Sequence, residues 1–176
     1  GENYVYVPGV SGNYLSVSDE AALDITGDID IRVRVAIDDY ASGARQVLLE
    51  KGTTNTELNY SVELGSTGAL VFRFGDGSSL FTASSSVNVP AVVSDGEVTW
   101  VRVTKTATGD VDFYTSADGV TFAALGVTQT ISTNTPFVGS GGLHIGARLG
   151  SDLASGKYYR AQVLNGIDGT PVLDVD

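Results

Sequence analysis

The amino-acid sequence predicts an all-β protein made of two packed sheets, and three observations support that fold class. Apolar residues recur at every second position, which is the period of a strand with one buried and one exposed face. Glycine is abundant, with 22 residues, whereas Lys and Arg together number only 10, and this composition favours strands and turns over helices. Turn sequences such as Asp-Gly and Asn-Gly separate the short apolar segments along the chain.

The clearest strand covers residues 28–37. Its apolar residues all fall on one face, and they are Ile29, Ile31, Val33, Val35 and Ile37. The opposite face carries Asp28, Asp30, Arg32, Arg34 and Ala36. Because one face is apolar and the other is largely charged, we expect a half-buried strand whose charged side is solvated and forms cross-strand ion pairs.

Further strands are predicted wherever a short apolar or alternating run ends at a turn, which gives roughly eleven to thirteen strands in all. They cover residues 46–51, 59–64, 69–74, 80–83, 87–93, 97–106, 111–115, 120–125, 143–147, 157–164 and 171–175. The turn at Asp118-Gly119 predicts a hairpin between the segments 111–115 and 120–125. One helical turn is expected at 19–23, with Ser18 as its cap.

Length and composition predict a single domain. The 176 residues are enough for one sizeable core, which we place at 12–176, with residues 1–11 as an N-terminal arm or edge strand. The chain has no cysteine, which excludes disulfides and thiolate metal sites. The net charge of −11 disfavours nucleic-acid binding. No apolar run approaches the roughly 18 residues that membrane insertion requires.

The order of several short motifs resembles a known family. The motifs are Gly12-Asn13-Tyr14-Leu15-Ser16-Val17, the strand 29–37, Glu50-Lys51-Gly52, Thr99-Trp100-Val101-Arg102-Val103, Leu143-His144-Ile145-Gly146 and Tyr159-Arg160-Ala161-Gln162-Val163. This series resembles laminin G-like domains of the concanavalin A-like lectin–glucanase superfamily, of the kind found in bacteriophage structural proteins. The resemblance implies a two-sheet antiparallel jelly-roll sandwich, in a family whose members bind glycans, bind proteins or build particles.

Two hypotheses for the function follow from that resemblance. The first is a non-enzymatic structural or interaction module of a phage-like virion, such as a capsid decoration, head-fibre or tail-associated protein. Its partners would be capsid or tail proteins and further copies of itself in a homo-oligomer, and its location would be the virion. The alternative is a secreted or extracellular carbohydrate-binding, lectin-like module that recognises a cell-surface glycan, with calcium as its candidate cofactor.

A glycoside hydrolase is the third hypothesis, and the sequence argues against it. The superfamily includes glucanases that use two carboxylates, and Asp28 and Asp30 share one strand face. However, Arg32 stands where a third acid would be expected, so a charged strand surface explains the pattern more simply. His144 is the only histidine, and no Gly-x-Ser-x-Gly motif accompanies it, so we assign it to a strand and expect no enzyme.

Four aromatic residues are candidates for ligand binding, because sugar sites use aromatic platforms beside polar groups. They are Tyr40, Trp100, Tyr158 and Tyr159. Trp100 lies on a strand with apolar residues on both faces, so a core or interface position explains it better than a sugar platform. Tyr158 and Tyr159 are adjacent in a strand and point to opposite faces, so at most one of them lines a site.

Five acidic residues near predicted loops are candidates for a calcium site, since calcium takes six to eight oxygen ligands from carboxylates and carbonyls. They are Asp38, Asp39, Asp110, Asp152 and Asp168, with Asp112 close to Asp110 in sequence. One bound calcium ion is what the lectin-like resemblance implies. The chain contains no Asp-x-Asp-x-Asp-Gly loop, and aspartate also favours turns for its own backbone reasons, so both explanations remain open.

Overall fold

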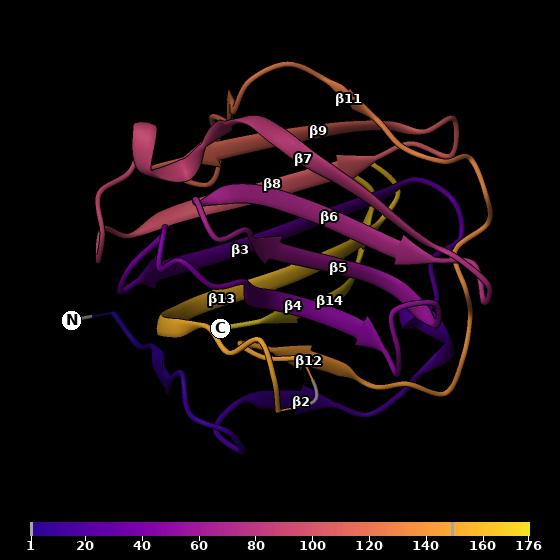
Figure 1. Ribbon diagram of the computed structural model, residues 1–176, viewed down its shortest axis with the longest axis horizontal. Coiled ribbons are helices and arrows are strands. Elements are labelled where there is room, and N and C mark those ends of the chain that lie inside the picture. The colour runs from indigo at the N-terminus through magenta and orange to yellow at the C-terminus, as the bar shows by residue number, and fades with distance from the viewer. Residues whose placement is uncertain (1, 149) are drawn as a thin grey trace.

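The computed structural model describes residues 2–148 and 150–176, which form two antiparallel sheets packed face to face (Figure 1). The eight-stranded sheet has the order β1 (Val5–Pro8), β13 (Ser155–Asn165), β3 (Ile29–Ile37), β8 (Thr99–Lys105), β9 (Asp110–Ser116), β10 (Ala123–Ala124), with β11 (Gln129–Thr130) paired to β9 and β14 (Thr170–Val175) paired to β13. The six-stranded sheet has the order β2 (Leu15–Val17), β12 (Leu143–Ile145), β4 (Gln46–Gly52), β5 (Leu58–Leu64), β6 (Ala69–Gly75), β7 (Leu80–Asn88). The predicted all-β, two-sheet antiparallel sandwich is confirmed.

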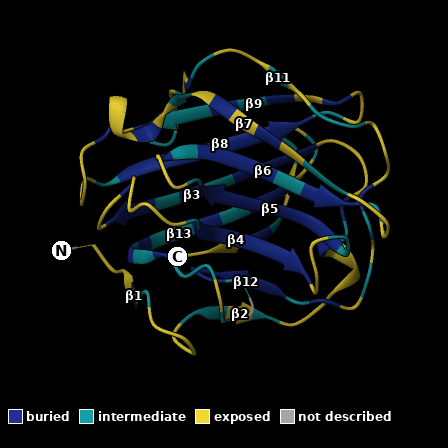
Figure 2. Cartoon of the chain, viewed as in Figure 1, coloured by how far each residue is buried: buried dark blue, intermediate teal, exposed yellow. Residues whose placement is uncertain are grey.

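The core lies between the two sheets and is built from the alternating apolar residues of the strands. Ile31 pairs with Val103 and Val33 pairs with Val101 across β3 and β8, and all four side chains are buried. The same buried cluster includes residues of the six-stranded sheet, among them Leu49, Val62 and Phe72. Burial of each such side chain contributes about 1.5–3 kcal/mol. Figure 2 shows the result, with buried strands and largely exposed connections.

The segments predicted as two strands at 80–83 and 87–93 form one strand and a turn instead. β7 continues to Asn88, although its pairing with β6 shifts register between Ser84 and Asn88, and a 3-10 turn, η2 (Val89–Ala91), follows it and contains Pro90. Ser85 explains why the strand continues through a run of serines. Its Oγ accepts a hydrogen bond from the Leu70 amide at 3.0 Å and donates one to the Val87 carbonyl at 2.7 Å.

The hairpin strand predicted at 120–125 is wrong for most of its length, because only Ala123 and Ala124 pair with β9. The Asp118 carboxylate accepts hydrogen bonds from the amides of Val120 and Thr121, both at 2.8 Å. These amides are therefore committed to a local turn, and Val120 is 84% exposed. β11, which the sequence did not predict, pairs with the other end of β9.

Residues 2–25 lie along the edges of the sandwich. A 3-10 turn, η1 (Ala21–Leu23), replaces the predicted helical turn at 19–23, and Ser18 does not cap it, because Glu20 holds the cap position without a side-chain hydrogen bond. β1 is an edge strand on β13, with Val7 opposite Gly156. Within the described ranges, no helix is long and apolar enough to cross a membrane.

Candidate functional site

One row of polar side chains crosses the outer face of the six-stranded sheet from edge to edge. Paired residues of neighbouring strands point to the same face, so the strand register defines the row. In order, its members are Ser16 (β2), His144 (β12), Glu50 (β4), Ser61 (β5), Arg73 (β6) and Thr82 (β7). Glu63 lies two residues beyond Ser61 on β5 and therefore shares this face. Residues far apart in the sequence are thus brought side by side.

Glu63 is completely buried although it belongs to an outer face. Its Oε1 accepts a hydrogen bond from Ser61 Oγ at 2.7 Å. Its Oε2 lies 3.3 Å from Arg73 Nε and 3.6 Å from Arg45 Nη1. Among the described residues, neither Glu63 Oε2 nor Arg73 Nε has a hydrogen-bond partner. Charge attraction therefore holds the cluster together, while one acceptor and one donor are left without a bond.

Glu50 is also completely buried, and its carboxyl oxygens accept no hydrogen bond from the described chain. Arg148 Nε is its nearest cation, 3.6 Å from Oε1. Burial raises the pKa of Glu50 to about 8, and the negative charge of Glu63 adds to the effect, while Arg148 opposes it. Glu50 is therefore mostly protonated and uncharged at neutral pH.

His144 faces Glu50 across the β12–β4 ladder. The predicted strand position of His144 is confirmed, and its ring packs edge-on against Tyr14, with ring centroids 5.3 Å apart. Its Nδ1 is buried and has no hydrogen-bond partner in the part of the chain that the structure describes. Burial lowers the pKa of His144, so the imidazole is neutral at physiological pH.

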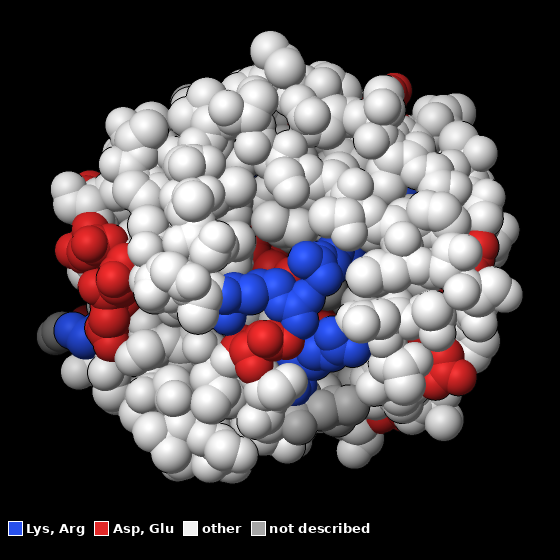
Figure 3. Space-filling model, in the orientation of Figure 1, with Lys and Arg blue, Asp and Glu red and all other residues white. Residues whose placement is uncertain are grey.

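A hollow opens over Glu63 on this face, and we call it the polar hollow. Arg45, Glu63, Val71, Arg73, Thr82 and Ser84 line it, residues 43–44, 65–67 and 69 complete the lining, and its volume is about 430 Å³. Figure 3 shows basic and acidic residues gathered in a depression near the centre of this face, surrounded by uncharged residues. Arg45 is held in place by an ion pair with Asp152, whose positive φ of 48° is uncommon for a residue other than glycine.

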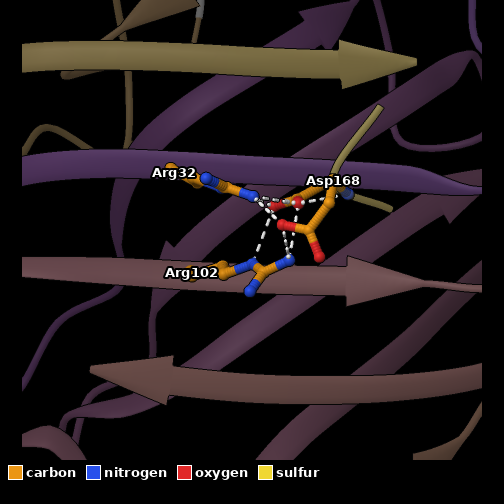
Figure 4. A network of polar contacts seen from close by, with 4 residues as sticks. Arg32, Arg102 and Asp168 are labelled. Atoms are coloured by element: carbon orange, nitrogen blue, oxygen red, sulfur yellow. Dashed lines mark hydrogen bonds and ion pairs between the residues drawn. The ribbon is translucent and has the colours of Figure 1, made fainter. Parts of the chain in front are cut away.

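The outer face of the eight-stranded sheet also buries a carboxylate, that of Asp30, but both of its oxygens accept hydrogen bonds. Arg32 and Arg102 each donate two hydrogen bonds to Asp30, at distances between 2.7 and 3.1 Å, and the Asp168 amide donates another at 3.0 Å. Figure 4 shows Arg32, Arg102 and Asp168 converging on one point. Burial acts to raise the pKa of Asp30, but these hydrogen bonds outweigh it and hold the pKa below its usual value.

The prediction that residues 28–37 present a solvated outer face is therefore wrong for Asp30 and Ala36, which are both buried. For Asp30, the physical reason is an aromatic side chain from another segment, which cannot be seen in the sequence of the strand. The Phe122 ring lies 5.5 Å from the guanidinium carbon of Arg32 and 5.1 Å from that of Arg102, so it closes the network from outside. The cross-strand ion pair that the sequence predicted is present, but it is enclosed.

The four candidate aromatic residues lie in two different environments. Tyr40 and Tyr158 belong to the core. Tyr40 donates a hydrogen bond to the Glu97 carbonyl at 3.0 Å, and Tyr158, which is 5% exposed, lines a small pocket with Val5 and Leu15. Trp100 and Tyr159 lie together on the outer face of the eight-stranded sheet, where they line a second pocket with residues that include Arg34 and Arg160.

That second pocket is largely committed to contacts within the chain. The Arg34 guanidinium stacks on the Tyr159 ring at 5.1 Å, and Arg160 forms two hydrogen bonds of 2.7 Å with Asp174. Gly119 covers the indole of Trp100 so closely that an added Cβ would lie 2.6 Å from Nε1. Trp100 is accordingly only 8% exposed.

Four of the five candidate calcium ligands are held by separate partners. Asp38 accepts hydrogen bonds from Tyr6 and Ser155, and Asp39 accepts one from the Ala41 amide. Asp152 pairs with Arg45, Asp168 pairs with Arg32 and Arg102, and Asp110 is an exposed residue at the start of β9. No group of three or more His, Asp or Glu residues placed to hold a metal ion occurs among the described residues.

Comparisons with known proteins identify the fold. No protein-family model matches the chain, and no curated protein matches it. Among solved structures, the CBM40 module of a Ruminococcus gnavus sialidase bound to α2,3-sialyllactose superposes with a TM-score of 0.64 at 15% identity, over 94% of this chain and 91% of that module. The chain therefore has the concanavalin A-like, laminin G-like fold that the sequence motifs suggested.

Two further solved structures share the fold over part of their length. Domains LG4-5 of the mouse laminin α1 chain match with a TM-score of 0.64 at 14% identity, over 98% of this chain and 44% of that one. Botulinum neurotoxin type C, which interacts with two ganglioside molecules, matches with a TM-score of 0.65 at 14% identity, over 94% of this chain and 42% of that chain.

Proposed function

We propose that this chain is a non-enzymatic carbohydrate-binding, lectin-like module whose sugar occupies the polar hollow. The observation that carries the proposal is the pair of buried, unbonded polar atoms at its base, Glu63 Oε2 and Arg73 Nε. Each sugar hydroxyl has one donor hydrogen and two acceptor lone pairs, so a sugar can supply both missing bonds once the partly exposed side chains of Arg45 and Arg73 move to admit it. The cost of leaving these groups unbonded, about 1–3 kcal/mol each, would be recovered on binding.

The shape and chemistry of the site support the same proposal. A hollow of about 430 Å³ is within the range of small-molecule sites. The hydroxyls of Thr82 and Ser84 add further hydrogen-bonding groups, and Val71 provides an apolar surface for the C–H groups of a sugar ring. The similarity to a sialyllactose-binding module and to a ganglioside-binding toxin is consistent with this use of the fold.

A glycan array tests the proposal. We expect the chain to bind at least one class of glycan, and we expect Arg73→Ala to weaken that binding by about tenfold or more, because it removes a hydrogen-bonding partner at the base of the hollow. Arg160→Gln is the matched control, since it removes an arginine from the opposite face. The array is run with calcium and with a chelator, which also tests the predicted calcium dependence. Absence of binding under both conditions contradicts the proposal.

A second candidate function, the interaction module of a phage-like virion, is favoured by the exposed apolar residues at the N-terminal edge. Tyr4, Val5 and Tyr6 are 49%, 46% and 50% exposed, and Val10 is 55% exposed. Exposed apolar residues on an edge strand are suited to contact a capsid or tail protein or a second copy of the chain. Mass spectrometry of purified particles tests this candidate, and particles that lack the chain would reject it.

A further inference from the structure

The base of the polar hollow contains both an acceptor and a donor, placed side by side. Glu63 Oε2 and Arg73 Nε lie 3.3 Å apart, yet their geometry does not make a hydrogen bond between them. The Glu63 side chain is completely buried, so its position is fixed by the packing around it. The hydrogen bond from Ser61 to Oε1 holds the carboxylate with Oε2 toward Arg73 and Arg45.

This arrangement matches a ligand that donates and accepts at neighbouring positions. Two adjacent hydroxyls of a sugar ring do so, because one can donate to Glu63 Oε2 while the other accepts from Arg73 Nε. A carboxylate or sulfate group offers acceptors only. It would leave Glu63 Oε2 without a donor and would place a second negative charge against it.

The local charge balance points the same way. The hollow is lined by two arginines, Arg45 and Arg73, and their charges are already matched by the carboxylates of Glu63 and Asp152. The chain as a whole carries a net charge of −11, which repels anionic ligands at long range. The described lining contains no aromatic residue, so hydrogen bonds rather than ring stacking must select the sugar.

We propose that the polar hollow selects uncharged sugars with two adjacent hydroxyls, and that Glu63 and Arg73 determine this specificity. The inference rests on the proposed carbohydrate-binding function and narrows it to one class of ligand. It also separates this chain from the two solved structures above whose ligands, sialyllactose and gangliosides, are named.

Calorimetric titration with matched glycans provides the test. The panel consists of neutral oligosaccharides of glucose, mannose and galactose, lactose among them, each beside a sialylated or sulfated counterpart. We expect a neutral member to bind, and its charged counterpart to bind at least about tenfold more weakly when the charge replaces one of the adjacent hydroxyls. We expect Glu63→Gln to weaken the neutral sugar by about tenfold or more, while Arg160→Gln leaves its affinity unchanged.

Three outcomes decide between the claims. Binding of charged glycans in preference to neutral ones, or neutral binding that Glu63→Gln and Arg73→Lys both leave intact, overturns the selectivity and leaves the carbohydrate-binding function standing. Failure of the wild-type chain to bind any glycan overturns the function itself. If Glu63→Gln does not fold, Arg73→Lys and the rim variant Thr82→Val take its place, and both are expected to weaken the neutral sugar.

Discussion

The two outer faces of the sandwich each bury carboxylates among arginines, and they differ in how many of the polar atoms are hydrogen-bonded. On the eight-stranded sheet, Asp30 receives five hydrogen bonds, and the Phe122 ring covers the pair of arginines that supply four of them. On the six-stranded sheet, Glu63 Oε2 and both oxygens of Glu50 receive none from the described residues. The same residue types thus form a completed network around Asp30 and an incomplete one around Glu63 and Glu50.

A structural charge cluster and a ligand-binding one can be told apart by whether their buried polar atoms are hydrogen-bonded within the chain. A buried ion pair by itself says little, because desolvation offsets much of its attraction. What distinguishes the polar hollow is that an unbonded acceptor and an unbonded donor lie side by side in an open depression, whereas the pocket beside Trp100 has only the unbonded donor Arg34 Nε.

The largest expected effect comes from Asp30→Asn. The change removes the buried charge that binds Arg32 and Arg102 and leaves only the exposed carboxylate of Asp168 to pair with their guanidinium groups, although Arg102 is itself buried. We expect the free energy of unfolding to fall by about 3–5 kcal/mol, measured by urea denaturation. The corresponding change on the other face, Glu63→Gln, should cost less, because Glu63 Oε2 accepts no hydrogen bond in the described structure. Equal losses for the two variants would contradict the contrast.

The next effect concerns pH and Glu50. Burial raises its pKa from 4.5 to about 8, so between these values the folded chain holds a proton that the unfolded chain has released. Glu50 therefore supports folding at low pH, and this contribution is lost as the pH rises toward 8, by up to about 1.4 kcal/mol per pH unit. We expect Glu50→Gln to gain stability relative to wild type from pH 5 to pH 8. Urea titrations at the two values check this, and a constant difference would show that Glu50 titrates normally.

A smaller effect is expected from Phe122→Leu. The substitution keeps an apolar side chain over the Asp30 network but removes the aromatic ring that faces Arg32 and Arg102. We expect a loss of about 1 kcal/mol in the free energy of unfolding, with glycan affinity unchanged because the ring belongs to the other face. Thermal unfolding and the glycan titration, run in parallel, check the two halves of this prediction. Loss of glycan binding would indicate that the glycan binds to the eight-stranded sheet and not in the polar hollow.

The smallest effect is expected from Arg160→Gln. Its ion pair with Asp174 lies at the surface, where solvent screens the attraction. We expect a change in stability within about 0.5 kcal/mol and no change in glycan affinity. A substantial loss of binding would indicate that the pocket beside Trp100, rather than the polar hollow, holds the sugar.

Much of the fold could be predicted from the sequence, because hydrophobic alternation is a local signal. The strand at 28–37 and the short strand that contains His144 were found in this way. The strand predictions failed where polar side chains form hydrogen bonds with the backbone, which the alternation of apolar residues does not show. The Asp118 carboxylate accepts hydrogen bonds from amides of the expected hairpin strand, and the hydrogen bonds of Ser85 support one strand where two were predicted, at 80–83 and 87–93.

The candidate site was not predicted, because it depends on strand register and on what covers each face. Every residue of β4 and β5 is buried, so burial does not distinguish Glu50 and Glu63 from the apolar residues beside them. One sequence signal was present: Ser61 and Glu63 alternate with Tyr60, Val62 and Leu64, which assigns an acid to the outer face of β5. The contacts of Glu63 with Arg45 and Arg73 depend on pairing between strands that are distant in the sequence, and so does the position of Glu50 opposite His144.

The most direct test of the account is to locate a bound sugar by NMR, using backbone amide shifts during titration with the tightest glycan from the panel. We predict that the largest shifts fall on β5, β6, β7 and the segments 43–45 and 65–67, around Glu63 and Arg73. The indole N–H of Trp100, the only tryptophan, serves as an internal reporter for the opposite face and should not move. Shifts centred on Trp100 and Tyr159, with none around Glu63, would contradict the account.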